Sequence, residues 1–264
     1  MDTESRKRDR FMNIGVVVLA TNRYFLLGLR FIHKWRKHYK GNKNITFYLF
    51  TDTEPSDYID TSDVIHYYST NETWVEGANS KFKNILRLQD VDEGYLYFFD
   101  ADTNIQQDFT EDWFLGSVVG GQHFGDQDWM KHVKSYDRNP KSSCYIPQNT
   151  TRPQMYYYGA FFGGVKGEMM KLCKEIYRRQ QKNREIQYEP PVNDESYLNR
   201  EYHYAPPTKV VMCRDFPFII SDKGSIPEIR DVKTDFSKEL NVIKQNYNVP
   251  FDLVSGEVKF IQND

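Results

Sequence analysis

The sequence predicts an α/β protein built around a mostly parallel β-sheet. Apolar, β-branched segments alternate along the chain with segments of helical periodicity, which is the pattern of strands joined by crossover helices. Several strand segments are apolar at nearly every position, as expected of strands that are buried on both faces. The chain has 264 residues, of which 39% are hydrophobic and 16% aromatic, so it can bury one large core. We expect a single domain without internal repeats.

The first unit is a strand, a helix and a second strand. Residues 13–20 form an apolar run rich in valine, and residues 45–50 form another that ends at Thr51 and Asp52. Between them, over residues 24–40, apolar side chains recur at helical spacing, namely Phe25, Leu29, Ile32, Trp35 and Tyr39. Because a crossover helix connects parallel strands, the two strands are expected to run in the same direction.

The following segments continue this alternation. Residues 64–68 predict a third strand, residues 81–90 a helix, and residues 95–99 a fully apolar strand. After residue 105 the pattern is less regular, because glycines in 116–121 and prolines in 140–153 interrupt it. We therefore expect loops over these two stretches.

The domain boundaries follow from the same survey. Residues 1–12 form a charged N-terminal tail, and residues 13–220 hold the α/β domain, including a further helix after Gly167. Residues 221–264 are polar and only weakly periodic. We expect them to form a C-terminal tail or flap that is part of the same domain.

The charge distribution argues against a nucleic-acid partner. The formal net charge is −2, which provides no overall positive field. The first 43 residues nevertheless carry 11 basic and 3 acidic side chains, many of them on the helical segment 24–40. A solvated basic helix face is the ordinary explanation, and a weak peripheral contact with an anionic membrane surface is the alternative.

The sequence has no signal for export or membrane insertion. No apolar run approaches the roughly 20 residues that a transmembrane helix needs, and residues 1–10 are charged rather than apolar. The three cysteines, Cys144, Cys173 and Cys213, are odd in number and lack a CxxC spacing, which argues against a disulfide framework and a zinc site. We expect a soluble, cytoplasmic protein.

The strongest chemical motif is an acidic pair at the end of the apolar strand 95–99. Asp100 and Asp102 flank Ala101, and residues two apart in an extended chain project to the same side. Such carboxylates at a strand's carboxyl end suit Mg²⁺ or Mn²⁺ that bridges to a diphosphate. Nucleotide-sugar glycosyltransferases use this pattern, and so do phosphatases with a DxDxT signature, which Thr103 completes. The phosphatase signature belongs near the first strand, and here the motif lies a hundred residues into the chain.

Two further segments have both ordinary and chemical explanations. Residues 156–164 combine aromatic residues, among them Tyr156, Tyr157, Phe161 and Phe162, with glycines, which suits a sugar stacked on rings or a core strand with a tight turn. Asn193, Asp194 and Glu195 precede an apolar stretch, as acidic residues at a helix N-terminus do.

The order and spacing of these segments resemble glycosyltransferase family 6, the family of the histo-blood-group A and B transferases and of α-1,3-galactosyltransferase. The resemblance covers residues 13–215 and is most specific over 136–215. It rests on these motifs together with Ser135-Tyr136-Asp137-Arg138, Cys144-Tyr145-Ile146-Pro147, Leu198-Asn199 and Pro207-Thr208-Lys209-Val210. It implies a GT-A fold, a UDP-sugar donor, and transfer of galactose or N-acetylgalactosamine with retention to the 3-hydroxyl of an oligosaccharide or glycolipid acceptor.

The resemblance also implies which residues bind the donor. Those that match positions around the uracil, ribose and diphosphate are Leu19, Ala20, Thr21, Tyr24, Trp74, Lys81, Asp100, Ala101 and Asp102. Asp100 and Asp102 match the DxD motif that holds Mn²⁺, with Mg²⁺ as an alternative, so we expect metal dependence. Where this chain has Lys81, the family usually has arginine, whose planar fork a lysine cannot reproduce.

For the reacting sugar, Glu195 matches the proposed nucleophile and Asp194 the residue that holds sugar hydroxyls. A carboxylate at this place either forms a covalent glycosyl-enzyme or stabilises an oxocarbenium-like centre; the sequence does not choose between them. Asn193 departs from the histidine that usually precedes the acidic pair.

The triplet Tyr158, Gly159 and Ala160 matches positions that sort donor sugars. Alanine at its third place goes with galactose in the mammalian members, because its methyl group occupies the space of an acetamide. We expect UDP-galactose, with UDP-N-acetylgalactosamine or UDP-glucose as alternatives.

His123 and Ser135 match acceptor-binding positions. In the family a basic C-terminal tail closes over UDP. The tail of this chain after residue 215 does not align with it, so Lys244 and Lys259 are only candidates to replace the family's basic residues. A non-catalytic, glycan-binding relative is the alternative from another functional class.

Overall fold

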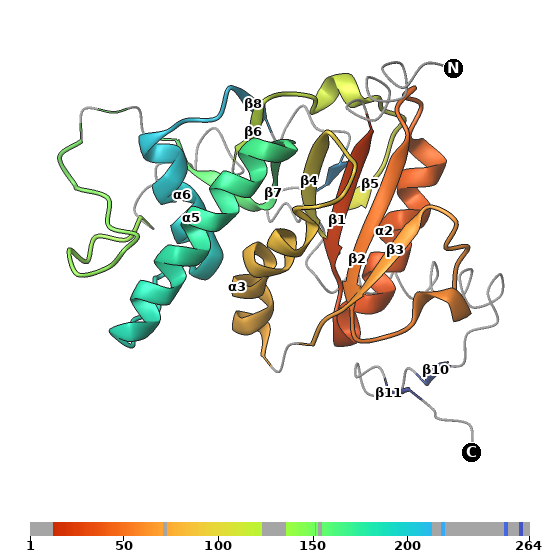
Figure 1. Cartoon of the computed structure of the whole chain (residues 1–264), viewed down its shortest axis with the longest axis horizontal. Coiled ribbons are helices and arrows are strands. Elements are labelled where there is room, and N and C mark those ends of the chain that lie inside the picture. The colour runs from red at the N-terminus through yellow and green to blue at the C-terminus, as the bar shows by residue number, and fades with distance from the viewer. Residues whose placement is uncertain are drawn as a thin grey trace.

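The computed structural model describes residues 13–70, 73–122, 136–150, 152 and 155–212, with the short pairs 218–219, 251–252 and 259–260. A seven-stranded sheet lies between two layers of helices (Figure 1). The expected mostly parallel α/β architecture is confirmed.

The sheet combines a parallel half with a mixed half. Its strand order is β3-β2-β1-β4-β7-β6-β8, in which the first four strands are parallel. Strand β7 is antiparallel to both of its neighbours, and β8 is parallel to β6. The strands are β1 (Ile14–Leu19), β2 (Ile45–Thr51), β3 (Val64–Tyr68), β4 (Tyr95–Asp100), β6 (Val118–Gln122), β7 (Tyr157–Val165) and β8 (Lys209–Met212).

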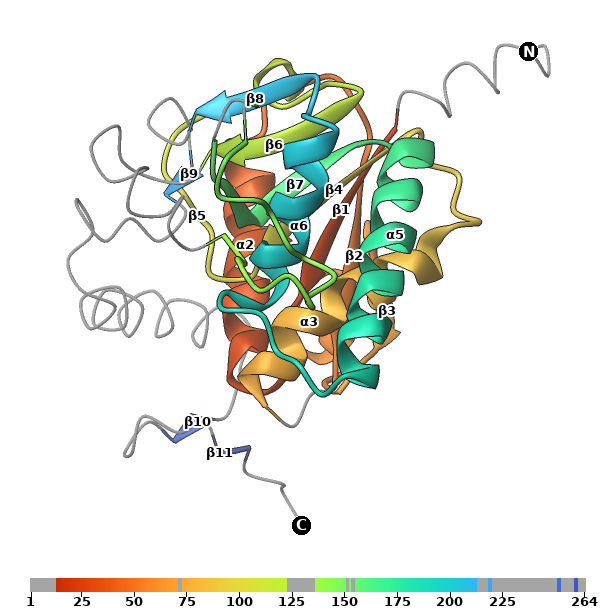
Figure 2. The ribbon, with the colours of Figure 1, turned by 90° about the vertical axis from the view of Figure 1, so that its left-hand side faces the viewer.

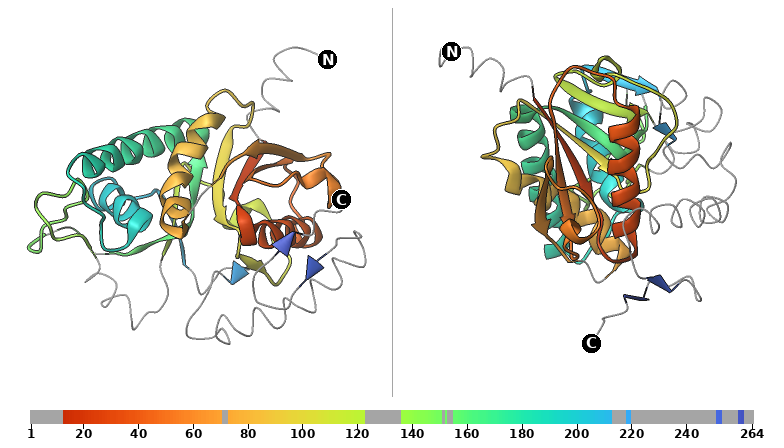
Figure 3. Two further views of the ribbon diagram at one scale, coloured as in Figure 1. Left: turned by 90° about the horizontal axis from the view of Figure 1, so that it is seen from below. Right: turned by 90° about the vertical axis from the view of Figure 1, so that its right-hand side faces the viewer.

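Helices cover both faces of the sheet. Helix α2 (Phe25–His38) packs on one face, and α3 (Trp74–Ile85), α5 (Lys166–Glu185) and α6 (Asn193–Tyr204) lie on the other (Figure 2). In both views of Figure 3, the sheet lies between α2 and α5. In the described part of the chain, no helix is both long and apolar enough to cross a membrane.

Short elements complete the topology. Four 3₁₀ helices occur among the described residues: η1 (Asn22–Tyr24), η2 (Pro55–Asp57), η3 (Leu86–Leu88) and η4 (Glu111–Trp113). Two short antiparallel pairs join β5 (Asn104–Ile105) to β9 (Phe218–Ile219) and β10 (Phe251–Asp252) to β11 (Lys259–Phe260).

Each face of the sheet has its own hydrophobic core. Under α2, Trp35 packs edge-on against Phe99 and Phe109, with ring centroids 5.2 and 5.0 Å apart. On the opposite face, Phe82 of α3 packs against Phe162 of β7, with centroids 5.5 Å apart. The apolar positions that predicted the helices around residues 24–40 and 81–90 are thus their buried sides.

Two predictions about local structure are wrong. The helix expected over residues 81–90 begins at Trp74 and ends at Ile85, followed by η3. The described side chains before Lys81 are exposed or half-buried, so they show no apolar face; a capping box in which Thr73 and Glu76 bond each other's backbone N–H groups starts the helix.

The glycine-rich stretch expected to be a loop is strand β6. A Cβ atom at Gly120 would lie 2.9 Å from the Tyr202 ring and 3.0 Å from that of Tyr157. Glycine is therefore needed here because aromatic rings pack closely on the strand, not because the chain turns.

Candidate active site

The loop after β1 lies at the carboxyl edge of the parallel strands. In the sheet register Leu19 is level with both the end of β2 and Asp100 of β4. Ala20 and Thr21, which follow it, are buried, and Tyr24 is half-buried against the core under α2. The residues predicted to receive the nucleotide are thus adjacent to the end of the strand that carries the acidic pair.

Asp100 is the last residue of β4, and Asp102 lies two residues beyond it. Ala101 between them is buried in the core under α2. Nη2 of Arg30 donates to the main-chain carbonyl of Asp102 at 3.3 Å, which fixes the chain after the strand.

The two aspartates are costly to ionise together. Burial raises the pKa of Asp100 to about 7; Lys81 opposes this rise and the Asp102 carboxylate adds to it. Because 38% of the Asp100 side chain is exposed, solvent screens part of this effect. Burial likewise raises the pKa of Asp102, and Arg30 opposes the rise. A bound cation would relieve this repulsion.

The donor set fits a metal ion that is shared with a substrate. Among the described residues, no group of three or more His, Cys, Asp or Glu side chains is arranged to hold a metal. Asp100 and Asp102 would therefore supply only part of a coordination shell, as Mg²⁺ sites often do when phosphate and water oxygens complete them.

Lys81 of α3 connects the two acidic motifs. Its Nζ lies 2.7 Å from Oδ2 of Asp194 and 3.4 Å from Oδ1 of Asp100, and it donates to the carbonyl oxygen of Gly159 at 3.1 Å. The contacts with Asp100 and Gly159 are hydrogen bonds, and the contact with Asp194 is an ion pair. Burial lowers the pKa of Lys81, but the attraction of Asp100 and Asp194 outweighs it, so that the pKa is raised.

Gly159 of β7 lets the acidic pair approach the strand. Its N–H donates to Oε1 of Glu195 at 2.9 Å. A Cβ atom at Gly159 would lie 2.6 Å from Oδ2 of Asp194 and 2.8 Å from Cγ of Glu195. Any side chain here would push the two acids away from the strand.

The acidic pair opens helix α6. Asn193, the first residue of the helix, has a φ of 33°, a left-handed conformation that asparagine tolerates better than most residues. Burial and the nearby Asp194 raise the pKa of Glu195 to about 8, while hydrogen bonds from the Gly159 N–H and the Tyr156 side chain oppose the rise.

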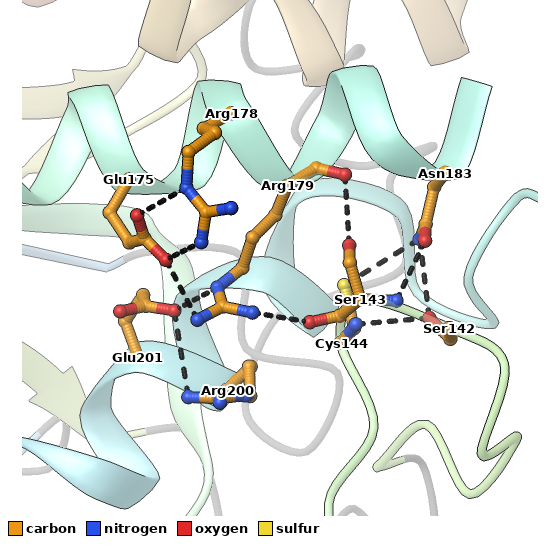
Figure 4. Close-up of polar contacts among 9 residues, drawn as sticks. All are labelled: Ser142, Ser143, Cys144, Glu175, Arg178, Arg179, Asn183, Arg200 and Glu201. Atoms are coloured by element: carbon orange, nitrogen blue, oxygen red, sulfur yellow. Dashed lines mark hydrogen bonds and ion pairs between the residues drawn. The ribbon is translucent and has the colours of Figure 1, made fainter. Parts of the chain in front are cut away.

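Polar contacts anchor α6 to its neighbours (Figure 4). Arg179 of α5 forms an ion pair with Glu201 of α6 and donates to the carbonyl oxygen of Ser143 at 2.9 Å. Asn183 of α5 accepts from the N–H of Ser143 at 2.8 Å and donates to the Tyr197 hydroxyl at 3.2 Å. These contacts fix α6, and with it the acidic pair, against α5.

Some predicted site residues are not part of this cluster. Ala160 is 1% exposed and packs in the core under α2, against which Tyr158 also packs. Trp74 begins α3, but its side chain is outside the described part of the structure, as is that of Lys259. His123, Ser135 and Lys244 also lie outside the described residues.

Of the two explanations given for the aromatic residues of 156–164, a sugar stacked on rings and a core strand, the first is wrong for Phe161 and Phe162. Both rings are fully buried, one in each core, because β7 is a central strand with a helix layer on both faces. Tyr156, which precedes β7, has a side chain that contacts Glu195 and a ring that stacks on Tyr136 with centroids 5.6 Å apart, and the sequence did not predict either contact.

A separate cavity of about 310 Å³ lies between α3 and α5, lined in part by Glu76, Lys83 and Arg184. None of the predicted site residues lines it.

Comparison with known proteins decides the family. The sequence model of glycosyltransferase family 6 matches residues 3–245. The chain belongs to glycosyltransferase family 6. Its mixed seven-stranded sheet with helices on both faces is consistent with the GT-A-like fold of such glycosyltransferases.

Two vertebrate relatives are similar to this chain at low sequence identity. The chain is 26% identical over 208 residues, 75% of its length, to the histo-blood group ABO system transferase 1 of Rattus norvegicus. It is 23% identical over 209 residues, 76% of its length, to the globoside alpha-1,3-N-acetylgalactosaminyltransferase 1 of Gallus gallus. The matches span 59% and 60% of the lengths of these two proteins.

The match to a bacterial relative covers more than two thirds of both proteins. The O-antigen biosynthesis glycosyltransferase WbnI of Escherichia coli is 24% identical over 188 residues, which is 69% of this chain and 74% of that protein.

Proposed function

We propose that the protein is a metal-dependent, retaining glycosyltransferase that moves galactose from UDP-galactose to the 3-hydroxyl of a glycan acceptor. The observation that carries the proposal is the contact of Lys81 with both Asp100 and Asp194. It joins the acidic pair at the end of β4 to the acidic pair at the start of α6, which supports one site for the groups proposed to act on the diphosphate and on the sugar. Membership of family 6 supports the same reaction class.

The donor would bind across the carboxyl edge of the sheet. Loop residues 19–24 would receive the uridine, and Asp100 and Asp102 would hold Mn²⁺ or Mg²⁺ beside the diphosphate. When bound, the cation would act as a Lewis acid that stabilises the charge developing on the leaving UDP.

The protein's own carboxylates would act on the sugar. Asp194, fixed by Lys81, would accept hydrogen bonds from sugar hydroxyls. Glu195, oriented by the Gly159 N–H, would face the anomeric carbon while the bond to UDP breaks and UDP leaves with the electron pair. If Glu195 forms a covalent glycosyl ester, the ester C–O bond breaks as the acceptor oxygen bonds the anomeric carbon; if Glu195 instead stabilises an oxocarbenium-like centre, the acceptor oxygen adds to that centre from the side that UDP leaves. In both cases the configuration is retained, and the acceptor's proton would pass to a phosphate oxygen of UDP.

Galactose is favoured as the donor sugar by Ala160, through the resemblance of the triplet 158–160 to donor-sorting positions. The chicken relative's name specifies an α-1,3 linkage and N-acetylgalactosamine, which makes the latter the first alternative donor.

A panel of UDP-sugars, each incubated with and without acceptor glycans and with Mn²⁺ or EDTA, tests the proposal through the release of UDP. We expect UDP release from UDP-galactose that needs metal and rises with acceptor. Release from UDP-N-acetylgalactosamine or UDP-glucose alone would reassign the donor. No release from any UDP-sugar, with glycan binding retained, would identify a non-catalytic relative. Release of phosphate from phosphomonoesters would identify a phosphatase.

A further inference from the structure

Asp52 and Asn22 form a contact between two strand ends. The N–H of Asn22, just after β1, donates to both carboxylate oxygens of Asp52, just after β2, at 3.0 and 3.1 Å. Thr21, the residue that precedes η1, makes no side-chain capping bond. The carboxylate of Asp52 therefore caps the helical segment from a neighbouring strand, a role that is usually local.

Asn22 needs such a partner because of its backbone conformation. Its φ of 53° is left-handed, a conformation that asparagine tolerates better than most residues but that only glycine adopts without a steric cost. The conformation turns the chain between the buried Thr21 and the half-buried Tyr24. A change in the φ angle of Asn22 would therefore alter the course of the loop over residues 20–24.

Asp52 is itself held in place. It follows Thr51, which is fully buried. The hydroxyl groups of Thr51 and Thr53 lie 3.5 and 3.4 Å from Oδ1 of Asp52, and the N–H of Thr53 donates to the Thr51 hydroxyl at 3.3 Å. The carboxylate thus presents a fixed acceptor to the loop.

We propose that Asp52 is a positioning residue for the nucleoside diphosphate of the donor: its carboxylate holds Asn22 in the left-handed conformation and so keeps residues 20–24 in the shape that receives the nucleotide. The inference rests on the proposed function, which assigns the nucleotide to this loop. Asp52 acts through the backbone of Asn22, and it contacts neither the reacting sugar nor the cluster of Lys81, Asp194 and Glu195.

The test uses Asp52→Ala, Asp52→Asn and the double variant Asp52→Ala/Asn22→Gly in the full chain. Glycine adopts a positive φ without a partner, so it should restore the loop when the carboxylate is absent. Asp60→Ala is the matched control. Like Asp52, Asp60 accepts a hydrogen bond from a backbone N–H, here that of Ser62 at 2.9 Å, but it lies in the loop that leads into β3. Thermal melting shows which variants are folded.

Three measurements are made on each variant: the Kd for UDP with Mn²⁺, KM and kcat for the UDP-sugar, and hydrogen exchange of residues 20–24 without ligand. If Asp52→Ala leaves a tenth of the molecules binding-competent, the Kd and KM rise about tenfold while kcat changes little. Exchange in the loop should speed up. Asp52→Asn, which retains one acceptor oxygen, should have a Kd between those of the wild type and Asp52→Ala. The double variant Asp52→Ala/Asn22→Gly should regain a Kd close to that of the wild type.

The outcomes separate this inference from the proposed function. Unchanged loop exchange and Kd in Asp52→Ala, with UDP binding by the wild type, overturn the positioning role alone. A double variant as impaired as Asp52→Ala overturns it too, because Asp52 would then act other than through Asn22. A fall in kcat with an unchanged KM assigns Asp52 to chemistry instead of positioning and overturns the inference. Wild-type protein that binds no UDP overturns both proposals.

Discussion

Lys81 and Asp194 form a buried ion pair, with Nζ 2.7 Å from Oδ2 and side chains only 5% and 9% exposed. Removal of one partner of such a pair leaves the other charge uncompensated in the interior. Because Lys81 also faces Asp100, its single charge offsets acids from both motifs of the site.

Replacement of Lys81 is expected to damage both stability and transfer. Lys81→Met should destabilise the protein by about 3–5 kcal/mol, as loss of one partner of a buried pair does. Lys81→Arg keeps the charge and should retain measurable transfer. The free energy of unfolding from urea titration and kcat/KM for the UDP-sugar measure the effects. Lys83→Met, on the exposed side of the same helix, should change stability by no more than about 0.5 kcal/mol; equal losses in both variants would contradict a specific role for Lys81.

Gly159→Ala tests the close approach of the acids to β7. The added methyl would overlap Asp194 and Glu195, so we expect a destabilisation of about 1–3 kcal/mol and a large loss of kcat. Gly167→Ala is the control, since a Cβ atom there meets nothing within 4 Å. Helix propensity should make this control neutral or slightly stabilising. Wild-type activity in Gly159→Ala would show that the acids need not approach the strand.

Asp102→Asn tests the metal role at the end of β4. The substitution keeps the size of the side chain and removes one charge, so affinity for Mn²⁺ in the presence of UDP should fall, and transfer with it. Titration of Mn²⁺ into the UDP-bound protein measures the affinity. Asp108→Asn changes a carboxylate that pairs with His38 outside the site and is the matched control. Full activity of the wild type in EDTA would rule out metal dependence.

Ala160→Gly tests the donor assignment. If the methyl group limits the space for an acetamide, the ratio of kcat/KM for UDP-N-acetylgalactosamine to that for UDP-galactose should increase. One methyl group in a pocket commonly accounts for about 10-fold to 200-fold in discrimination. Because Ala160 is buried, part of its effect would be on packing, so the melting temperature is measured in parallel. An unchanged ratio would remove Ala160 from donor selection.

The sequence predicted the parallel half of the sheet well because its signals are local. The run 95–99 is apolar, and the register that aligns Leu19 with Asp100 follows from parallel pairing of central strands. The start of α3 was missed because its first turns are not buried and so show no apolar face, while the helix start is set by the cap between Thr73 and Glu76.

Contacts within the site were harder to predict because they are distant in sequence. The motif resemblance placed Lys81, Asp100 and Asp194 near the donor, but no local pattern shows that the lysine bridges the two acids. Nor does a glycine in an aromatic strand reveal that two carboxylates pack against it. Both relations arise from the packing of α3 and α6 on β7.

Glu195→Gln tests the electrostatics of the proposed nucleophile. The pKa of Glu195 is raised to about 8 in the folded protein, above its ordinary value of 4.5. Ionisation of Glu195 therefore costs folding free energy, and this cost is absent below pH 4.5, grows as the pH rises, and is complete above pH 8. Relative to wild type, Glu195→Gln should gain stability between pH 5 and pH 9, by several degrees in Tm.

The rate of transfer should change with pH in the opposite direction to the stability of the wild type, which falls as Glu195 ionises. If the ionised form of Glu195 is the one that acts, wild-type kcat/KM should rise with pH through about 8. Glu195→Gln should then lose orders of magnitude in kcat/KM at and above pH 8, and progressively less at lower pH, where the wild-type carboxyl is protonated. Glu168→Gln, on the surface of α5 with Lys171 as its partner, should show neither effect. A difference in Tm between Glu195→Gln and wild type that does not grow with pH would contradict the raised pKa. Wild-type transfer rates in Glu195→Gln would remove this carboxylate from the reaction.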